Sequence, residues 1–145
     1  MTPAIRPLEA KDFDAWLPLW YGYNSFYRNE VAAEVTENTF RRLHENTDGF
    51  FGLVAEHDGG LVGLAHAIFH PSTWTMKGYC YLEDLFVARS HRGSGVARAL
   101  IEGVYTEADR RGADSVYWHT QSYNAPARSL YDQVAQSTSF VVYER

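Results

Sequence analysis

A change of pattern in the middle of the chain limits the possible folds. Tyr79–Val87 is apolar at most positions, which predicts a strand buried on both faces of a sheet. After Gly95 the apolar residues recur every three to four positions, which predicts an amphipathic helix that ends at Gly112. A buried strand followed by such a helix is typical of a sheet covered by helical layers.

The segments before this strand predict two helices and three strands. Pro18 should kink or divide the first helix, and Thr36 is the expected cap of the second. Asp58-Gly59-Gly60 provides the residues of a tight hairpin turn. The predicted elements are a strand at Ala4–Pro7, helices at Asp12–Asn24 and Thr36–Asn46, and strands at Phe50–His57 and Leu61–Phe69.

The segments after the long helix predict one more helix between two strands. The strands are Ser115–Thr120 and Phe140–Tyr143, and the helix begins at the cap Asn124 and runs to about Val134. The order along the chain is therefore β-α-α-β-β-β-α-β-α-β, an α+β fold with helices on the faces of its sheet. Since no repeat, low-complexity tract or linker interrupts residues 1–145, we expect a single domain.

Composition excludes several classes of protein. Apolar residues make up 46% of the 145 residues, enough for one globular core. A net charge of −5 argues against a general nucleic-acid binder and is compatible with a cationic ligand. No apolar run approaches the roughly 20 residues of a membrane span, and Met1–Arg6 lacks the layout of a secretory signal. With Cys80 as the only cysteine, these features predict a cytoplasmic protein that does not bind membranes.

The stretch between the buried strand and the long helix is the best candidate for a phosphate site. Gly93 and Gly95 would let a diphosphate approach the unpaired amides at the start of the helix, while Arg89, Arg92 and Arg98 would add positive charge. A plain glycine-containing turn with solvated arginines is the alternative. A Walker loop is excluded because no Gly-Lys-Ser/Thr ending is present, and a dinucleotide loop because position 98 is Arg.

This stretch resembles the acyl-coenzyme A loop of the GNAT superfamily of N-acetyltransferases. Three segments carry the resemblance, in the order that the family has: Tyr81-Leu82-Glu83-Asp84-Leu85-Phe86-Val87, similar to the diamine (polyamine or thialysine) acetyltransferase branch, Arg92-Gly93-Ser94-Gly95-Val96-Ala97, and Asn124-x-x-Ala127-x-x-Leu130-Tyr131. The resemblance implies a mixed, mostly antiparallel sheet and acetyl-CoA as co-substrate. It also implies a homodimer that transfers acetyl to a primary amine of a polyamine, an amino acid or a lysine side chain by direct attack in a ternary complex.

The resemblance also implies roles for individual residues in binding acetyl-CoA. Main-chain groups would hold the pyrophosphate and the pantetheine arm, and Asn124 would add a hydrogen bond to the pantetheine. The residues expected to bind acetyl-CoA are Leu85, Phe86, Val87, Arg92, Gly93, Ser94, Gly95, Val96, Ala97, Arg98 and Asn124.

Two residues are candidates for proton transfer. Glu83 is the predicted base for the acceptor amine, and the resemblance favours it over Asp84. Strict strand alternation would place Tyr79, Tyr81, Glu83 and Leu85 on one face, so only one of the two acids should reach a given cleft. Tyr131 is the predicted acid for the departing thiolate. The alternatives are a carboxylate paired with a cation and a tyrosine that belongs only to the core.

The acceptor side is predicted less sharply, as an aromatic and acidic pocket for an ammonium group. Its candidate residues are Tyr21, Tyr27, Glu30 and Asp84. The alternative is a core segment followed by a solvated helix face. No histidine pattern has metal-ligand spacing, so no metal is expected. A catalytically silent acyl-CoA-binding sensor or adaptor is the second hypothesis for the whole chain.

Overall fold

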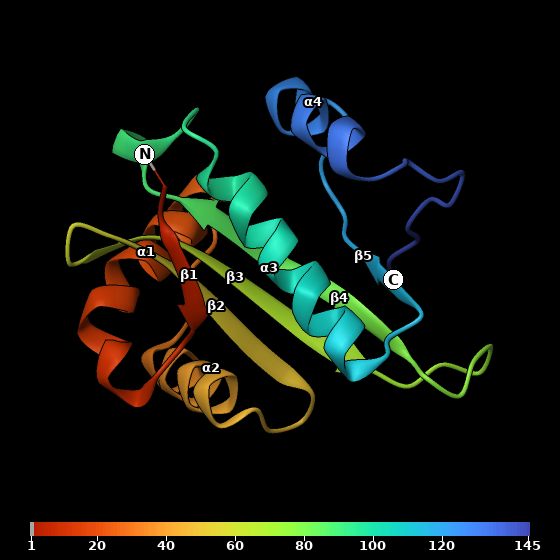
Figure 1. Ribbon diagram of the computed structural model, residues 1–145, viewed down its shortest axis with the longest axis horizontal. Coiled ribbons are helices and arrows are strands. Elements are labelled where there is room, and N and C mark those ends of the chain that lie inside the picture. Colours follow the sequence, from red (N-terminus) through yellow and green to blue (C-terminus); the bar gives the residue numbers. More distant parts are fainter. Residues whose placement is uncertain (1) are drawn as a thin grey trace.

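The computed structural model describes residues 2–145 and confirms the predicted α+β class (Figure 1). The strands are β1 (Ala4–Pro7), β2 (Phe50–His57), β3 (Gly60–His70), β4 (Tyr79–Val87) and β5 (Ser115–Tyr117). The helices are α1 (Phe13–Phe26), α2 (Ala33–Glu45), α3 (Val96–Arg111) and α4 (Ala125–Val134), with 3-10 turns at Ala10–Asp12 and Arg89–His91.

The sheet follows chain order, β1-β2-β3-β4-β5, and is antiparallel except for the last pair. β5 runs parallel to β4 and pairs only with Tyr79, Cys80 and Tyr81. It is shorter than the predicted Ser115–Thr120 because it separates from β4 after Tyr117. Residues 82–87 of β4 therefore have β3 on one side and no paired strand of residues 2–145 on the other.

A β-bulge in β4 changes which side chains share a face of the sheet. His66 of β3 lies opposite Asp84 and Ala67 lies opposite Leu82, so Glu83 is an extra residue without a partner. An extra residue reverses the alternation of side chains that follow it. Leu85 consequently packs on the same face as Leu82, and the predicted face shared by Tyr81, Glu83 and Leu85 is wrong.

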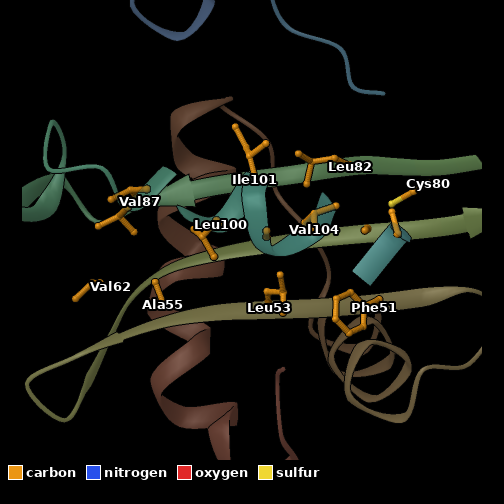
Figure 2. Close-up of a cluster of buried hydrophobic side chains, with 14 residues drawn as sticks. Phe51, Leu53, Ala55, Val62, Cys80, Leu82, Val87, Leu100, Ile101 and Val104 are labelled. Atoms are coloured by element: carbon orange, nitrogen blue, oxygen red, sulfur yellow. The ribbon is translucent and has the colours of Figure 1, made fainter. Parts of the chain in front are cut away.

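One face of the sheet is covered by α3 and has a mainly aliphatic core. Leu100, Ile101 and Val104 of α3 are fully buried against side chains of β2, β3 and β4 (Figure 2). The strand residues in this cluster include Phe51, Leu53, Ala55, Val62, Ala65, Ala67, Cys80, Leu82 and Val87.

The opposite face is covered by α1 and α2 and has an aromatic core. Trp16 and Trp20 of α1 stack at 5.5 Å between ring centroids, and Phe40 of α2 packs on Trp16 at 5.0 Å. α1 is not divided at Pro18. Pro18 has no N–H to donate to the carbonyl of Asp14, but both residues lie on the exposed side of the helix, where water can bond to that carbonyl.

Two further sequence predictions are corrected by the structure. α2 begins at Ala33, so Thr36 is not its cap: the Thr36 hydroxyl is buried in the first turn and accepts a hydrogen bond from Trp20 Nε1 at 2.9 Å. The segment Phe140–Tyr143 forms no strand and its side chains are 67% to 92% exposed. β-forming residues need a neighbouring strand to pair with, and this segment pairs with none within residues 2–145.

Candidate active site

The glycine loop presents a row of unused main-chain donors at the start of α3. Gly93 and Gly95 have φ angles of 78° and 87°, and nothing lies within 4 Å of the position of an added Cβ at either residue. Within residues 2–145, the amides of residues 93–98 donate to no other main-chain carbonyl. Open space above free amides at a helix start fits the diphosphate of an acyl-coenzyme A.

The three arginines near this loop differ in how they are held. Arg92 donates from Nε to the carbonyl of Val87 at 3.0 Å, and its guanidinium lies 5.3 Å from the ring centroid of Phe86. Its remaining N–H groups are left to face an anion. Arg89 is exposed on the 3-10 turn. Arg98 instead joins α3 to α4, because it donates to Glu102 and to Gln133 at 3.1 Å each.

The gap between β4 and β5 leaves main-chain groups of β4 free beside the glycine loop. Leu85, Phe86 and Val87 pair with β3 on one side only. Asn124 begins α4 on the far side of the gap and accepts a hydrogen bond from the amide of Ala127 at 3.4 Å, as predicted for a cap. An extended arm with amide groups fits between the separated strands, because an open strand edge offers a main-chain donor or acceptor at each residue.

Tyr131 lies on α4, half-buried and edge-on to Trp118 at 5.4 Å between ring centroids. Burial raises the pKa of its hydroxyl above the ordinary value, and the nearby Tyr27 adds to the effect. The phenol therefore keeps its proton at neutral pH and remains able to donate it.

A cavity of about 640 Å³ lies between α1, α2 and the strands β2, β3 and β4. Its volume is in the range of small-molecule sites. Glu83 and Asp84 both line it, so the prediction that only one acid reaches a given cleft is wrong, and the bulge at Glu83 is the reason. The other lining residues are Trp20, Tyr23, Asn24, Tyr27, Arg28, Asn29, Val31, Val35, Thr39, Leu43, Phe50, His66, Ile68 and Tyr81.

Glu83 stands at the open side of this cavity. Glu83 as a whole is exposed to solvent, but protein surrounds part of its carboxyl. This partial burial raises the pKa of the carboxyl, and repulsion from Asp84 raises it further. A carboxylate with a raised pKa is a stronger base than an ordinary surface glutamate.

Asp84 belongs to a buried hydrogen-bonded chain below the cavity. Trp16 Nε1 donates to His66 Nε2 at 3.0 Å, so the His66 proton is on Nδ1, which donates to Asp84 Oδ2 at 2.9 Å. All three residues are buried, with His66 2% exposed. The chain fixes the Asp84 carboxylate at the cavity wall.

The predicted acceptor residues divide between two hollows. Tyr27 and Asp84 line the large cavity, and burial followed by the charge of Asp84 raises the pKa of Tyr27. Tyr21 and Glu30 instead line an adjoining hollow of about 300 Å³. Trp20, Asn24, Asn29 and Val31 border both hollows.

Sequence reasoning missed His66 and Arg28, which line the cavity, and Trp16, which hydrogen-bonds to His66 behind the cavity wall. The pairing of His66 with Asp84 depends on the register of two strands and on a bulge, neither of which leaves a local signal. Arg28 could have been noticed as a cation within a stretch of aromatic and acidic residues.

Fold and site together define an acyl-coenzyme A-dependent transferase. The chain belongs to the Acetyltransferase (GNAT) family, whose model matches residues 10–135. It is an acetyl-CoA-dependent N-acetyltransferase.

Comparison with known proteins gives relatives of similar length. The D-amino-acid N-acetyltransferase HPA3 of Saccharomyces cerevisiae is 38% identical over 143 residues, which are 97% of this chain and 89% of the relative. The thialysine N-epsilon-acetyltransferase of Caenorhabditis elegans is 28% identical over 102 residues, 67% of this chain and 61% of the relative. The structure of AAC(6')-Iy with a bisubstrate analogue superposes with a TM-score of 0.86 at 19% identity, covers 100% and 98% of the two chains, and shows the likeness of the fold.

No group of three or more His, Cys, Asp or Glu side chains in residues 2–145 is arranged to hold a metal ion. No helix in the same part is long and apolar enough to cross a membrane.

Proposed function

We propose that the protein transfers acetyl from acetyl-CoA to a primary amine by direct attack in a ternary complex. The observation that carries the proposal is that β4 connects the two halves of the site. The glycine loop with its free amides at residues 93–98 follows the end of β4, and Glu83 and Asp84 of β4 line the cavity. The loop would hold the diphosphate and the gap between β4 and β5 the pantetheine arm. The thioester would then lie beside the cavity that receives the amine.

In this reaction the amine nitrogen attacks the thioester carbon, an N–C bond forms and the C–S bond breaks. Glu83 takes the proton that the ammonium must lose, since an alkyl amine with a pKa near ~10.4 is almost fully protonated at neutral pH. The nitrogen loses a second proton as it becomes an amide. Tyr131 gives its proton to the departing thiolate and takes up this second proton, and the proton on Glu83 passes to solvent. The raised pKa makes Glu83 a stronger base, and the raised pKa of Tyr131 keeps its hydroxyl protonated until the thiolate departs.

A covalent acyl-enzyme has little support in this chain. Cys80 is the only cysteine and is fully buried on the α3 face, away from the cavity residues. Burial raises the pKa of its thiol to about 11, so almost no thiolate is available as a nucleophile. Direct attack requires no such group.

Among polyamines, amino acids and lysine side chains, we favour an amino acid as the acceptor. Both named relatives act on amino acids or their analogues, a D-amino acid and thialysine respectively. The thialysine relative also supports the diamine-like branch suggested by residues 81–87.

The test is coenzyme A release from acetyl-CoA with a panel of polyamines, D- and L-amino acids and basic peptides. We expect turnover with amino acids, and for Tyr131→Phe a loss of about 100-fold in kcat with little change in acetyl-CoA affinity. Binding of acetyl-CoA without turnover of any amine would favour the silent sensor or adaptor module instead.

A cytoplasmic homodimer of this single domain completes the proposal. The lone buried thiol of Cys80 fits a reducing compartment. Phe140, Val141, Val142 and Tyr143 leave large apolar side chains in solvent, which supports an interface with a second copy. Light scattering of the wild type and of a chain ending at residue 138 tests the dimer: a monomer in both would remove this part of the proposal.

A further inference from the structure

Arg28 occupies a backbone position that an arginine rarely takes. It follows α1 with φ at 53°, and its amide donates to the carbonyl of Ser25 at 3.0 Å while Asn29 N–H donates to the carbonyl of Asn24 at 2.8 Å. This pair of bonds is the Schellman motif, whose left-handed residue is usually Gly or Asn. α2 and α3 end in the same left-handed conformation with Asn46 and Gly112.

Arg28 is one of the residues that line the large cavity, and it forms no ion pair with a carboxylate within residues 2–145. Most other arginines of the chain are committed to one. Arg6, Arg41, Arg42, Arg98, Arg110 and Arg111 each form an ion pair with an Asp or Glu. A cation on a cavity wall without a protein anion is free to bind an anionic group of a ligand.

The loop that carries Arg28 is held in place by the buried side chain of Asn24. Asn24 Nδ2 donates to the carbonyl of Trp20 at 2.9 Å, and its Oδ1 accepts from Asn29 Nδ2 at 3.1 Å. Asn24 is 6% exposed. The backbone on which the guanidinium stands is therefore fixed before any ligand arrives, as a specificity residue requires.

The cavity thus has charges of both signs on its walls. Glu83 and Asp84 come from β4, and Arg28 comes from the loop between α1 and α2. A diamine would find its second ammonium group facing a cation. An α-amino acid carries a positive and a negative group, which match the two walls.

We propose that Arg28 binds the carboxylate of an α-amino acid acceptor and so selects amino acids over amines that lack a carboxylate. The inference rests on the proposed N-acetyltransferase function and names its acceptor. The planar guanidinium donates two parallel hydrogen bonds to the carboxylate, while the amino group faces Glu83.

The test compares an α-amino acid with its own carboxamide, in both enantiomers, as acceptors for the wild type and Arg28→Gly. Glycine adopts the left-handed conformation without strain, so this variant keeps the fold. We expect kcat/KM for the amino acid to fall about 10- to 100-fold and that for the carboxamide to stay within about 2-fold. The amino acid and its carboxamide differ in nucleophilicity. The ratio of kcat/KM between wild type and variant is therefore taken for each acceptor separately, so this difference cancels.

Arg28→Lys and Arg41→Ala complete the set. The lysine variant keeps the charge without the bidentate geometry and should recover part of the loss. Arg41 lies on the exposed surface of α2, paired with Glu45, and its removal should change neither acceptor.

Each contrary result has a distinct meaning. If Arg28→Gly weakens both acceptors equally, weakens neither, or raises KM for acetyl-CoA alone, the role of Arg28 is wrong while the transferase function stands. If the loss of kcat/KM in Arg28→Gly is larger for the carboxamide than for the amino acid, the inference also fails. If the wild type acetylates no amine at all, the proposed function fails and this inference fails with it.

Discussion

The two faces of the sheet have different kinds of core. The α3 face is mainly aliphatic, and its cluster contains no buried polar side chain except the Cys80 thiol. The α1/α2 face is aromatic and includes the buried polar residues Asn24, Thr36, His66 and Asp84. The acid-lined cavity opens on this second face. The α3 face therefore stabilises the fold by burial of apolar surface. The α1/α2 face buries less apolar surface, because part of it holds polar groups in place at a site.

β3 shows the difference at single-residue scale. Ala65 and Ala67 point to α3, while His66 between them points to the tryptophans of α1. The bulge at Glu83 then brings a second acid to the aromatic face. A small local irregularity is thus enough to turn one face of a sheet into a reactive surface.

The largest effect is expected for His66→Ala on the aromatic face. The change leaves the buried Asp84 carboxylate without its Nδ1–H donor and the Trp16 indole N–H without an acceptor. We expect the free energy of unfolding to fall by about 4 kcal/mol, together with a marked loss of kcat. Urea unfolding and steady-state kinetics measure both.

His66→Asn is the matched variant for this prediction. Its amide can restore a donor to Asp84, so about half of the lost stability should return. Equal losses in both variants would mean that the volume of the imidazole matters more than the hydrogen-bonded chain.

On the aliphatic face, Leu100→Ala should cost about 3 kcal/mol in unfolding free energy, because Leu100 is fully buried and its removal leaves a cavity. KM for the acceptor should not change, since Leu100 contacts the other side of the sheet from the cavity. If Leu100→Ala changed the acceptor KM as much as variants of cavity residues do, the separate roles assigned to the two faces would be wrong.

Glu83→Gln should reduce kcat/KM about 100-fold without a loss of stability, because Glu83 is exposed and acts on a proton. Asp84, His66, Tyr23 and Tyr81 face the same cavity. Burial and Asp84 raise the Glu83 pKa, so wild-type kcat/KM should fall with decreasing pH through a pKa above that of an ordinary glutamate.

In the pH profile, Glu83→Gln should lose this acidic limb, whereas Glu34→Gln on the exposed surface of α2 should keep it. Persistence of the limb in Glu83→Gln would assign the base to another group.

The elements that could be predicted are those whose signal lies within their own sequence. Elements with a local signal were correct: Phe50–His57 and Tyr79–Val87 from their apolar runs, and the α3 start from Gly95. The glycine loop also depends only on local sequence. Phe140–Tyr143 was wrong because a strand requires a partner, which composition cannot supply.

The acceptor side could be predicted only in outline. An aromatic and acidic stretch indicated the region, but Tyr21 lies within α1 and Tyr27 follows its last residue, so the two side chains fall in different hollows. The partnership of His66 and Asp84 joins residues 18 positions apart through a bulge. Contacts of this kind depend on tertiary register, which a single sequence does not encode locally.

The smallest effect concerns the ion pair that ties the start of α1 to the sheet edge. Arg6 of β1 donates to both oxygens of Asp12 at 2.8 and 2.9 Å, and Asp12 Oδ2 also accepts from Glu9 N–H at 2.8 Å. These bonds lower the Asp12 pKa, the hydrogen bond from Arg6 most of all. Asp12→Asn should therefore lower the unfolding free energy by about 1 to 2 kcal/mol at neutral pH.

The pH dependence gives this prediction its sign. A lowered folded-state pKa means that the contribution of Asp12 is fully present above the ordinary aspartate pKa and is lost as pH falls through the lowered value. Wild type and Asp12→Asn should differ in urea unfolding at pH 7 and converge in acid. A difference that stays constant into acid would show that Asp12 acts through packing of α1 on its aromatic face and not through its charge.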